Sequence, residues 1–275
     1  MFLVTASAGF GGRGTAPWDI SGARYDNISF SSTALADVGG IFFKDDGTKF
    51  YATQIGSPSG VQQFSLSIPW DISSATYDGL LYTSSSEDTA AYGIFIGSSG
   101  TKMYICGNAN DKIFQYTLST AWASSTATYD GVAVASSAED TSPNGIFFKD
   151  DGTKMFLLGD QNDKVFQYTL TTAWASSTAT YDSISFSSTN ISNPRSIVFN
   201  NDGTKAFISK ASGATMGVYQ WNLPTAWASS TAIYSDVLFI YQQSGLGASA
   251  AFNEEGSKLY VVIPSTDQAI YQYSL

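Results

Sequence analysis

The sequence predicts an all-β protein, a β-propeller of five blades with four strands in each blade. Three markers recur along the 275 residues with one spacing of about 52: a turn glycine, a tryptophan and a Gln-aromatic pair. The glycines are Gly47, Gly100, Gly152, Gly203 and Gly256, and the tryptophans are Trp18, Trp70, Trp122, Trp174 and Trp227. The pairs begin at Gln63, Gln115, Gln167, Gln220 and Gln272. Repeats of this length that hold several short strands are typical of propeller blades.

One repeat, residues 144–188, shows the four expected strands in order: GIFFK, KMFLLG, KVFQYTL and TYDSISF. The first two are separated by DDGT, a tight turn in which Gly152 can take a positive φ. The turn formers DQND follow the second strand. Aromatic and β-branched residues dominate the runs, as strands prefer, and the last run alternates apolar and polar residues. We therefore expect no long helix.

The repeats fill the chain and predict that the ring closes on itself. They span residues 15–66, 67–118, 119–170, 171–223 and 224–275, which leaves only an N-terminal arm, 1–14, outside. The chain ends on a QYSL strand, and an outer-type strand at 24–31 precedes the first inner strand. We expect 24–31 to pair with 268–275, because closure removes raw sheet edges.

The order GIxFxxDGTKMYxxGxxxDKVxQY resembles the first three strands of WD-repeat, NHL and YVTN-type propellers. The DGTK, QYTL and AW elements are similar to repeats of phage and marine bacterial proteins. The resemblance covers residues 15–275. It implies that the first strand of each unit lines a central channel, and that one face of the disc carries the loops between strands four and one and between strands two and three. Propellers host many functions, so it implies little about activity.

The amino-acid composition excludes several classes of binding partner and of catalytic or metal site. The formal net charge is −10, which disfavours DNA, RNA and anionic membranes. No histidine is present and Cys106 is the one cysteine, which removes Ser-His-Asp and Cys-His sites, most zinc sites and an intrachain disulfide. We expect no enzyme activity, no metal and no cofactor, with Ca²⁺ left open as a loop ligand. Cys106 is expected to be a buried structural thiol.

Targeting signals are absent from the sequence. No apolar run approaches the ~20 residues of a membrane span, and the start, MFLVTASAGF, lacks the basic region of a signal peptide. With 13% charged residues and much Ser, Thr, Gly and Tyr, the chain fits an extracellular surface or a virion.

A candidate ligand site lies on the loop face, where polar residues vary between repeats on a rigid scaffold. Amides, carboxylates, one arginine and one tyrosine suit a neutral polar ligand such as a surface glycan, or a protein surface. Asn and Asp also form turns, so part of this set is structural. The predicted site residues are Tyr92, Asn108, Asn144, Asp160, Asn162, Asn193 and Arg195.

The function expected from these features is a non-enzymatic binding or structural propeller, a tail, fibre or decoration component of a phage virion. A multivalent lectin with similar sites in each blade is one alternative, and there the tryptophans would be sugar platforms; otherwise they pack between blades. A glycoside-active enzyme with paired carboxylates is the other. Its acidic candidates are two copies of one SSxED motif and therefore look structural: Glu87, Asp88, Glu139 and Asp140.

The N-terminal arm has an apolar start and a glycine-rich segment, GFGGRG. We expect Phe2, Leu3 and Val4 to dock on a partner, either another virion or surface protein or a second copy of this chain.

Overall fold

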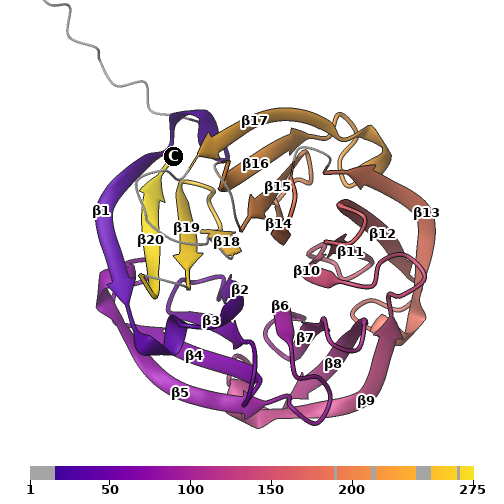
Figure 1. Ribbon diagram of the computed structural model, residues 1–275, viewed down its shortest axis with the longest axis horizontal. Helices are drawn as coiled ribbons and strands as arrows, with labels where there is room; N and C mark the ends of the chain where they lie inside the picture. Colours follow the sequence, from indigo (N-terminus) through magenta and orange to yellow (C-terminus); the bar gives the residue numbers. More distant parts are fainter. Residues whose placement is uncertain (1–15, 189–190, 212–214, 240–248, 265–266) are drawn as a thin grey trace, which may run out of the picture.

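The computed structural model describes residues 16–188, 191–211, 215–239, 249–264 and 267–275, which form a ring of five antiparallel four-stranded sheets (Figure 1). The first blade contains β2 (Val38–Phe43), β3 (Lys49–Gln54), β4 (Gly60–Leu66) and β5 (Ala75–Thr83). The second contains β6 (Ala91–Gly97), β7 (Lys102–Gly107), β8 (Lys112–Leu118) and β9 (Ala127–Ala135). The third contains β10 (Pro143–Phe148), β11 (Lys154–Gly159), β12 (Lys164–Leu170) and β13 (Ala179–Ser187).

The last two blades complete the circle. The fourth contains β14 (Pro194–Phe199), β15 (Lys205–Lys210), β16 (Gly217–Asn222) and β17 (Ile233–Phe239). The fifth contains β18 (Ser249–Phe252), β19 (Lys258–Ile263), β20 (Ala269–Ser274) and β1 (Arg24–Ser31). A short 3-10 turn precedes each outer strand: η1 (Ile20–Gly22), η3 (Ile72–Ser74), η4 (Ser124–Thr126), η5 (Ser176–Thr178) and η6 (Ser229–Thr231). None of the described helices is long and apolar enough to cross a membrane.

The two ends of the chain share the fifth blade, as predicted. Strand β1 lies outside β20 and pairs with it antiparallel, from Arg24 opposite Ser274 to Ser31 opposite Ala269 (Figure 1). The sheet order is β1-β20-β19-β18, so the outer strand precedes the other three in the chain. The ring therefore closes through hydrogen bonds between its N-terminal and C-terminal strands.

The core lies between neighbouring blades as well as within each sheet. One buried cluster joins Phe43, Phe50 and Phe64 of the first blade to Tyr260 and Val262 of the fifth. Such residues are fully or almost fully shielded from water, which is the main stabilising contribution to a fold of this kind. Cys106 is also fully buried, and burial raises the pKa of its thiol, as expected for a structural cysteine.

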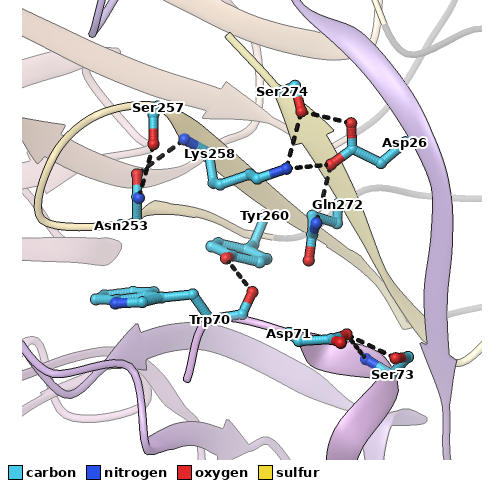
Figure 2. Close-up of polar contacts among 10 residues, drawn as sticks. All are labelled: Asp26, Trp70, Asp71, Ser73, Asn253, Ser257, Lys258, Tyr260, Gln272 and Ser274. Carbon is cyan, nitrogen blue, oxygen red and sulfur yellow. Dashed lines mark hydrogen bonds and ion pairs between the residues drawn. The ribbon is translucent and has the colours of Figure 1, made fainter. Parts of the chain in front are cut away.

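Each tryptophan packs against the turn of its own blade and the side of the preceding one. Trp70 takes a left-handed φ of 64°, and its N–H donates to the Gly47 carbonyl at 3.0 Å. Its ring stacks on Phe43, with centroids 5.6 Å apart. Its carbonyl accepts a hydrogen bond from the Tyr260 hydroxyl of the fifth blade at 2.7 Å (Figure 2). The prediction that the tryptophans pack between blades is confirmed; each ring packs on its turn glycine and on neighbouring aromatic rings, while Trp18, Trp70, Trp122 and Trp174 also border the central cavity.

The Lys of DGTK, the Gln of the QY pair and the Asp of TYD meet in one polar network. In the fifth blade, Asp26 accepts hydrogen bonds from Lys258 at 2.7 Å, Gln272 at 2.9 Å and Ser274 at 2.6 Å (Figure 2). Burial alone would raise the pKa of Asp26, but these three hydrogen bonds hold it below the ordinary value. The network explains why the Lys of DGTK, the Gln of the QY pair and the Asp of TYD recur together, because they tie strands two, three and four of a blade to one another. In the fourth blade Ser235 replaces the aspartate, and Lys205 donates to the Trp18 carbonyl instead.

The same glutamine also links one blade to the next. Gln115 Nε2 donates to Asp130 of its own blade at 2.7 Å, and its Oε1 accepts from the amide and the hydroxyl of Ser176, each at 2.8 Å. Gln272 has no such link among the described residues, because Ile72 stands where the next blade would supply the serine. The buried Oε1 of Gln272 is accordingly without a hydrogen-bond partner.

This difference gives a matched pair of variants. Gln115→Ala leaves the Ser176 amide and hydroxyl buried without an acceptor, whereas Gln272→Ala removes an oxygen that had no partner. Each buried group left unpaired costs about 1–3 kcal/mol. We expect Gln115→Ala to lower the free energy of unfolding in urea by at least about 1 kcal/mol more than Gln272→Ala. Equal losses would show that the link between blades does not stabilise the ring.

Candidate functional site

The ring encloses an axial channel with a cavity of about 530 Å³, surrounded by the inner strands β2, β6, β10, β14 and β18. At one position of these strands the wall carries apolar side chains: Phe42, Phe95, Phe147, Val198 and Ala251. Phe42 packs edge-on against Phe95 with centroids 5.1 Å apart, and Phe95 packs similarly on Phe147 at 5.3 Å. The channel therefore has an aromatic belt between two polar ends.

We call the two ends the loop mouth and the turn mouth. The loop mouth lies where the inner strands begin, beside the loops that lead into them and the loops between strands two and three. The turn mouth lies where the inner strands end, at the DGTK-like turns. Each mouth carries its own set of polar residues.

At the loop mouth the repeat symmetry breaks. The inner strands of the first four blades align on Gly40, Gly93, Gly145 and Ser196, and the residue just before each of these differs from blade to blade. That residue is Gly39, Tyr92, Asn144 and Arg195 in blade order. The ring therefore repeats its core but carries a different side chain at this position in each of these four blades.

Five of the predicted site residues, from three blades, come together at this mouth. The guanidinium carbon of Arg195 lies 4.8 Å from the ring centroid of Tyr92, a cation–π arrangement. Asn144 is fully buried; it donates to the Pro194 carbonyl at 2.9 Å and accepts from Asn108 at 3.0 Å. Asp160 lies beside them. Burial raises the pKa of Asp160, against the opposing effects of the Arg195 charge and a hydrogen bond from Asn144.

The structure thus gathers Tyr92, Asn108, Asn144, Asp160 and Arg195, and gives the other two predicted residues loop roles. Asn162 donates to the Glu139 carbonyl at 2.7 Å, and its own amide donates to Asp140 at 2.8 Å. Asn193 takes a left-handed φ of 57° just before β14, and its carbonyl accepts from Ala211.

The SSxED acids brace the loops. Asp140 is almost fully buried and accepts from the amides of Ser142, Gln161 and Asn162. Asp88 does the same in the preceding copy, with Ala90, Ala109 and Asn110. Their carboxyl groups are committed to the backbone, which supports the structural interpretation of this motif. The arm residues Phe2, Leu3 and Val4 lie outside the described residues.

The turn mouth holds an acidic group that the sequence interpretation missed. Asp45, Asp150 and Glu254 occupy one position, two residues before the turn glycine, in the first, third and fifth blades, and all three line the channel. Burial raises the pKa of Asp45, and the charges of Glu254 and Asp150 raise it further. Burial likewise raises the pKa of Asp150, with added repulsion from Asp151 and Glu254.

The signal for this group is present in the sequence as one repeat position, two residues before the turn glycine, that is acidic in three of the five repeats. Blades are radial, so the inner ends of different blades meet at the axis, and one repeat position supplies a ring of side chains. Within the described part of the chain, no group of three or more His, Cys, Asp or Glu residues is placed to hold a metal ion. The three carboxyl groups therefore lie near enough to repel one another but do not form a chelate.

No family model matches the chain, and no characterised protein matches it in sequence. Solved structures do. An exo-β-1,3-galactanase from Phanerochaete chrysosporium, solved with β-1,3-galactotriose, superposes with a TM-score of 0.59 over 91% of this chain and 64% of that one, at 13% identity. A Bacteroides fragilis protein assigned provisionally as a 6-phosphogluconolactonase superposes with a TM-score of 0.52 over 82% of this chain and 76% of that one, also at 13% identity.

At such low identities the superpositions establish a shared propeller fold but not a shared family or activity. The chain spans just under two thirds of the galactanase and 63% of a second provisionally assigned 6-phosphogluconolactonase, from Bacteroides uniformis, with a TM-score of 0.50 and 10% identity. None of these comparisons points to a phage.

The comparisons contradict the prediction that this chain is not an enzyme. That prediction took the absence of histidine and of a reactive cysteine as decisive. Rings that superpose on this one are named as a galactanase and as lactonases, so this architecture is used by enzymes. Glycoside hydrolysis needs only carboxyl groups, and the turn mouth supplies them.

The two aspartates of the DDGT turn should respond oppositely to neutralisation. Asp46 accepts from Lys44 and from the amide and hydroxyl of Thr48; despite some burial, these bonds lower the pKa of Asp46 to about 2. Its stabilising effect is present above the ordinary aspartate pKa and is lost as the pH falls through about 2. Asp45 has a raised pKa, so its charge destabilises the fold at neutral pH; the penalty begins to fall as the pH drops through that raised value and is gone below the ordinary aspartate pKa.

We therefore expect Asp45→Asn to raise the melting temperature at pH 7 by a few degrees and Asp46→Asn to lower it. The Asp45→Asn difference should disappear at pH values below the ordinary aspartate pKa of about 3.9, where the carboxyl is protonated in both states. Asp150→Asn and Asp151→Asn repeat the comparison in the third blade. Thermal unfolding followed by circular dichroism measures all four, and shifts of the same sign for Asp45→Asn and Asp46→Asn would contradict the assignment.

Proposed function

We propose that this chain is a glycoside-active propeller, which binds a glycan at the turn mouth and hydrolyses a glycosidic bond there. The observation that carries the proposal is the meeting of three carboxyl groups, from Asp45, Asp150 and Glu254, at one end of an aromatic-lined channel. A cavity of about 530 Å³ accommodates a short oligosaccharide. The shared fold with the galactanase supports the reaction class.

The reaction needs two carboxyl groups in different protonation states. One gives its proton to the leaving glycosidic oxygen; the other takes a proton from the attacking water or attacks the sugar itself. Asp45 and Asp150 suit the proton donor, because burial and like charges raise their pKa. Glu254, on the same ring of positions, is the counterpart that activates water or forms the bond to the sugar.

A lectin with equivalent sites in every blade fits the ring less well. The tryptophans that would have been its platforms are packed between blades, and the acids occupy three of the five equivalent turn positions, with Ser98 and Asn201 in the other two. An extracellular or virion surface remains the setting we propose, supported by the low charged content and by the abundance of glycan substrates on cell surfaces.

Activity of single variants tests the proposal. Release of reducing ends from β- and α-linked oligosaccharides should fall by about a hundredfold or more in Glu254→Gln and in whichever of Asp45→Asn and Asp150→Asn removes the proton donor, the usual loss for an acid–base residue. Ser98→Ala, at the equivalent position of the second blade, is the matched control and should retain activity. If the wild-type chain cleaves no oligosaccharide, or if its activity survives in all three acid variants, the proposal is wrong.

The coupling between the carboxyl groups can be measured without turnover. Replacing Glu254 by Gln removes a negative charge that raises the pKa of Asp45 and of Asp150, so both values should fall. Carbon-13 NMR titration of the aspartate carboxyl groups reports each value. In the control variant Glu255→Gln these two titrations should remain as in the wild type, since neither aspartate is affected by Glu255. Unchanged values in Glu254→Gln would mean that the three groups do not interact.

A further inference from the structure

We infer that the loop mouth is a second binding site, for a sugar that carries a single carboxylate, and that Arg195 recognises that carboxylate. The inference goes beyond the proposed function, because it concerns the opposite end of the channel and holds whether or not the bound sugar is cleaved. The sequence alone had suggested a neutral ligand for this face.

Arg195 is placed as a recognition residue rather than a structural one. It is half-buried, lines the channel and lies over the Tyr92 ring at 4.8 Å. Among the described residues, no hydrogen bond or ion pair engages its guanidinium group. A guanidinium fixed against an aromatic ring keeps its five N–H donors in a planar fork, which matches the two oxygens of a carboxylate.

The neighbouring acid does not neutralise this cation directly. Asp160 is close enough for its pKa to respond to Arg195, but it forms no ion pair with it. Burial raises the pKa of Asp160 in spite of that nearby positive charge. Among the described residues the positive charge of Arg195 therefore has no ion-pair partner and is left for the ligand.

The surroundings favour a sugar acid over a simple anion or a polyanion. The Asn144 side chain is buried and occupied by its bonds to Asn108 and Pro194, but Asn108 is half-buried, and its amide oxygen is of the kind that accepts from sugar hydroxyl groups. The net charge of −10 repels a polyanion. The acids of the turn mouth repel a carboxylate from the far end, so the channel is polarised along its axis and an acidic sugar is drawn to the Arg195 end.

The test compares methyl galactosiduronate, a sugar with one carboxylate, with its methyl ester, which keeps the sugar and removes the charge. Isothermal titration calorimetry should show the acid binding the wild-type chain at least about tenfold more tightly than the ester, as one charge-assisted bidentate contact allows. Arg195→Gln should abolish this preference, and Arg195→Lys should restore only part of it, because lysine keeps the charge but not the fork. Arg24→Gln, on the outer strand β1, makes the same change in net charge and should keep the preference.

Three outcomes would overturn the inference: no binding of methyl galactosiduronate, equal affinity for acid and ester, or a preference that persists in Arg195→Gln. Circular dichroism of each variant shows that it is folded. The result is separate from that for the turn mouth. Loss of hydrolysis in Glu254→Gln together with equal affinity for acid and ester would support the proposed function and contradict this inference. Hydrolysis that is unaffected in the acid variants, together with an Arg195-dependent preference for the acid, would contradict the proposed function and support this inference.

Discussion

The ring depends on the contact between a turn glycine and the tryptophan that covers it. A Cβ atom at Gly47 would lie 2.4 Å from the Trp70 ring, and the φ of Gly47, 69°, belongs to the left-handed region that glycine prefers. The same close approach recurs in the other four blades, with Gly256 under Trp18 in the fifth. Because glycine has no side chain, the indole ring of the tryptophan can pack directly on the turn. Each blade thereby places a large apolar group where the preceding blade can pack on it.

From that contact follow the ties that make five separate sheets into one ring. The tryptophan carbonyl of the first blade accepts from Tyr260 of the fifth, and the serine two residues beyond Trp174 reaches back to Gln115 of the second blade. These links all lie on the side of the DGTK-like turns. They require repeated residues there, and this is why the markers keep such a regular period.

On the opposite side the links between blades are made by residues that differ from blade to blade, such as Asn144 donating to the Pro194 carbonyl. The loop mouth can therefore carry Gly39, Tyr92, Asn144 and Arg195 at one strand position. The turn mouth combines a structural position with a variable one. Within the DDGT turn, Asp46 stabilises the turn and Asp45 is free to vary, so that aspartate, serine, asparagine and glutamate all occur at its position. Residues with destabilising charges at such places are typical of functional sites.

The sequence by itself determined the blade. Period, strand order, turn type and ring closure all follow from local patterns, and the pairing of β1 with β20 was predictable because the chain starts and ends at complementary points of the repeat. Several loop-mouth residues were predictable too, since variation within a regular repeat marks them out. Only the tertiary structure decided what meets at the axis. Asp45, Asp150 and Glu254 are about a hundred residues apart in sequence and come together only because radial sheets converge at their inner ends. Arg195 and Tyr92 likewise lie two blades apart along the chain, and their stacking is set by the width of the channel, which no local pattern encodes.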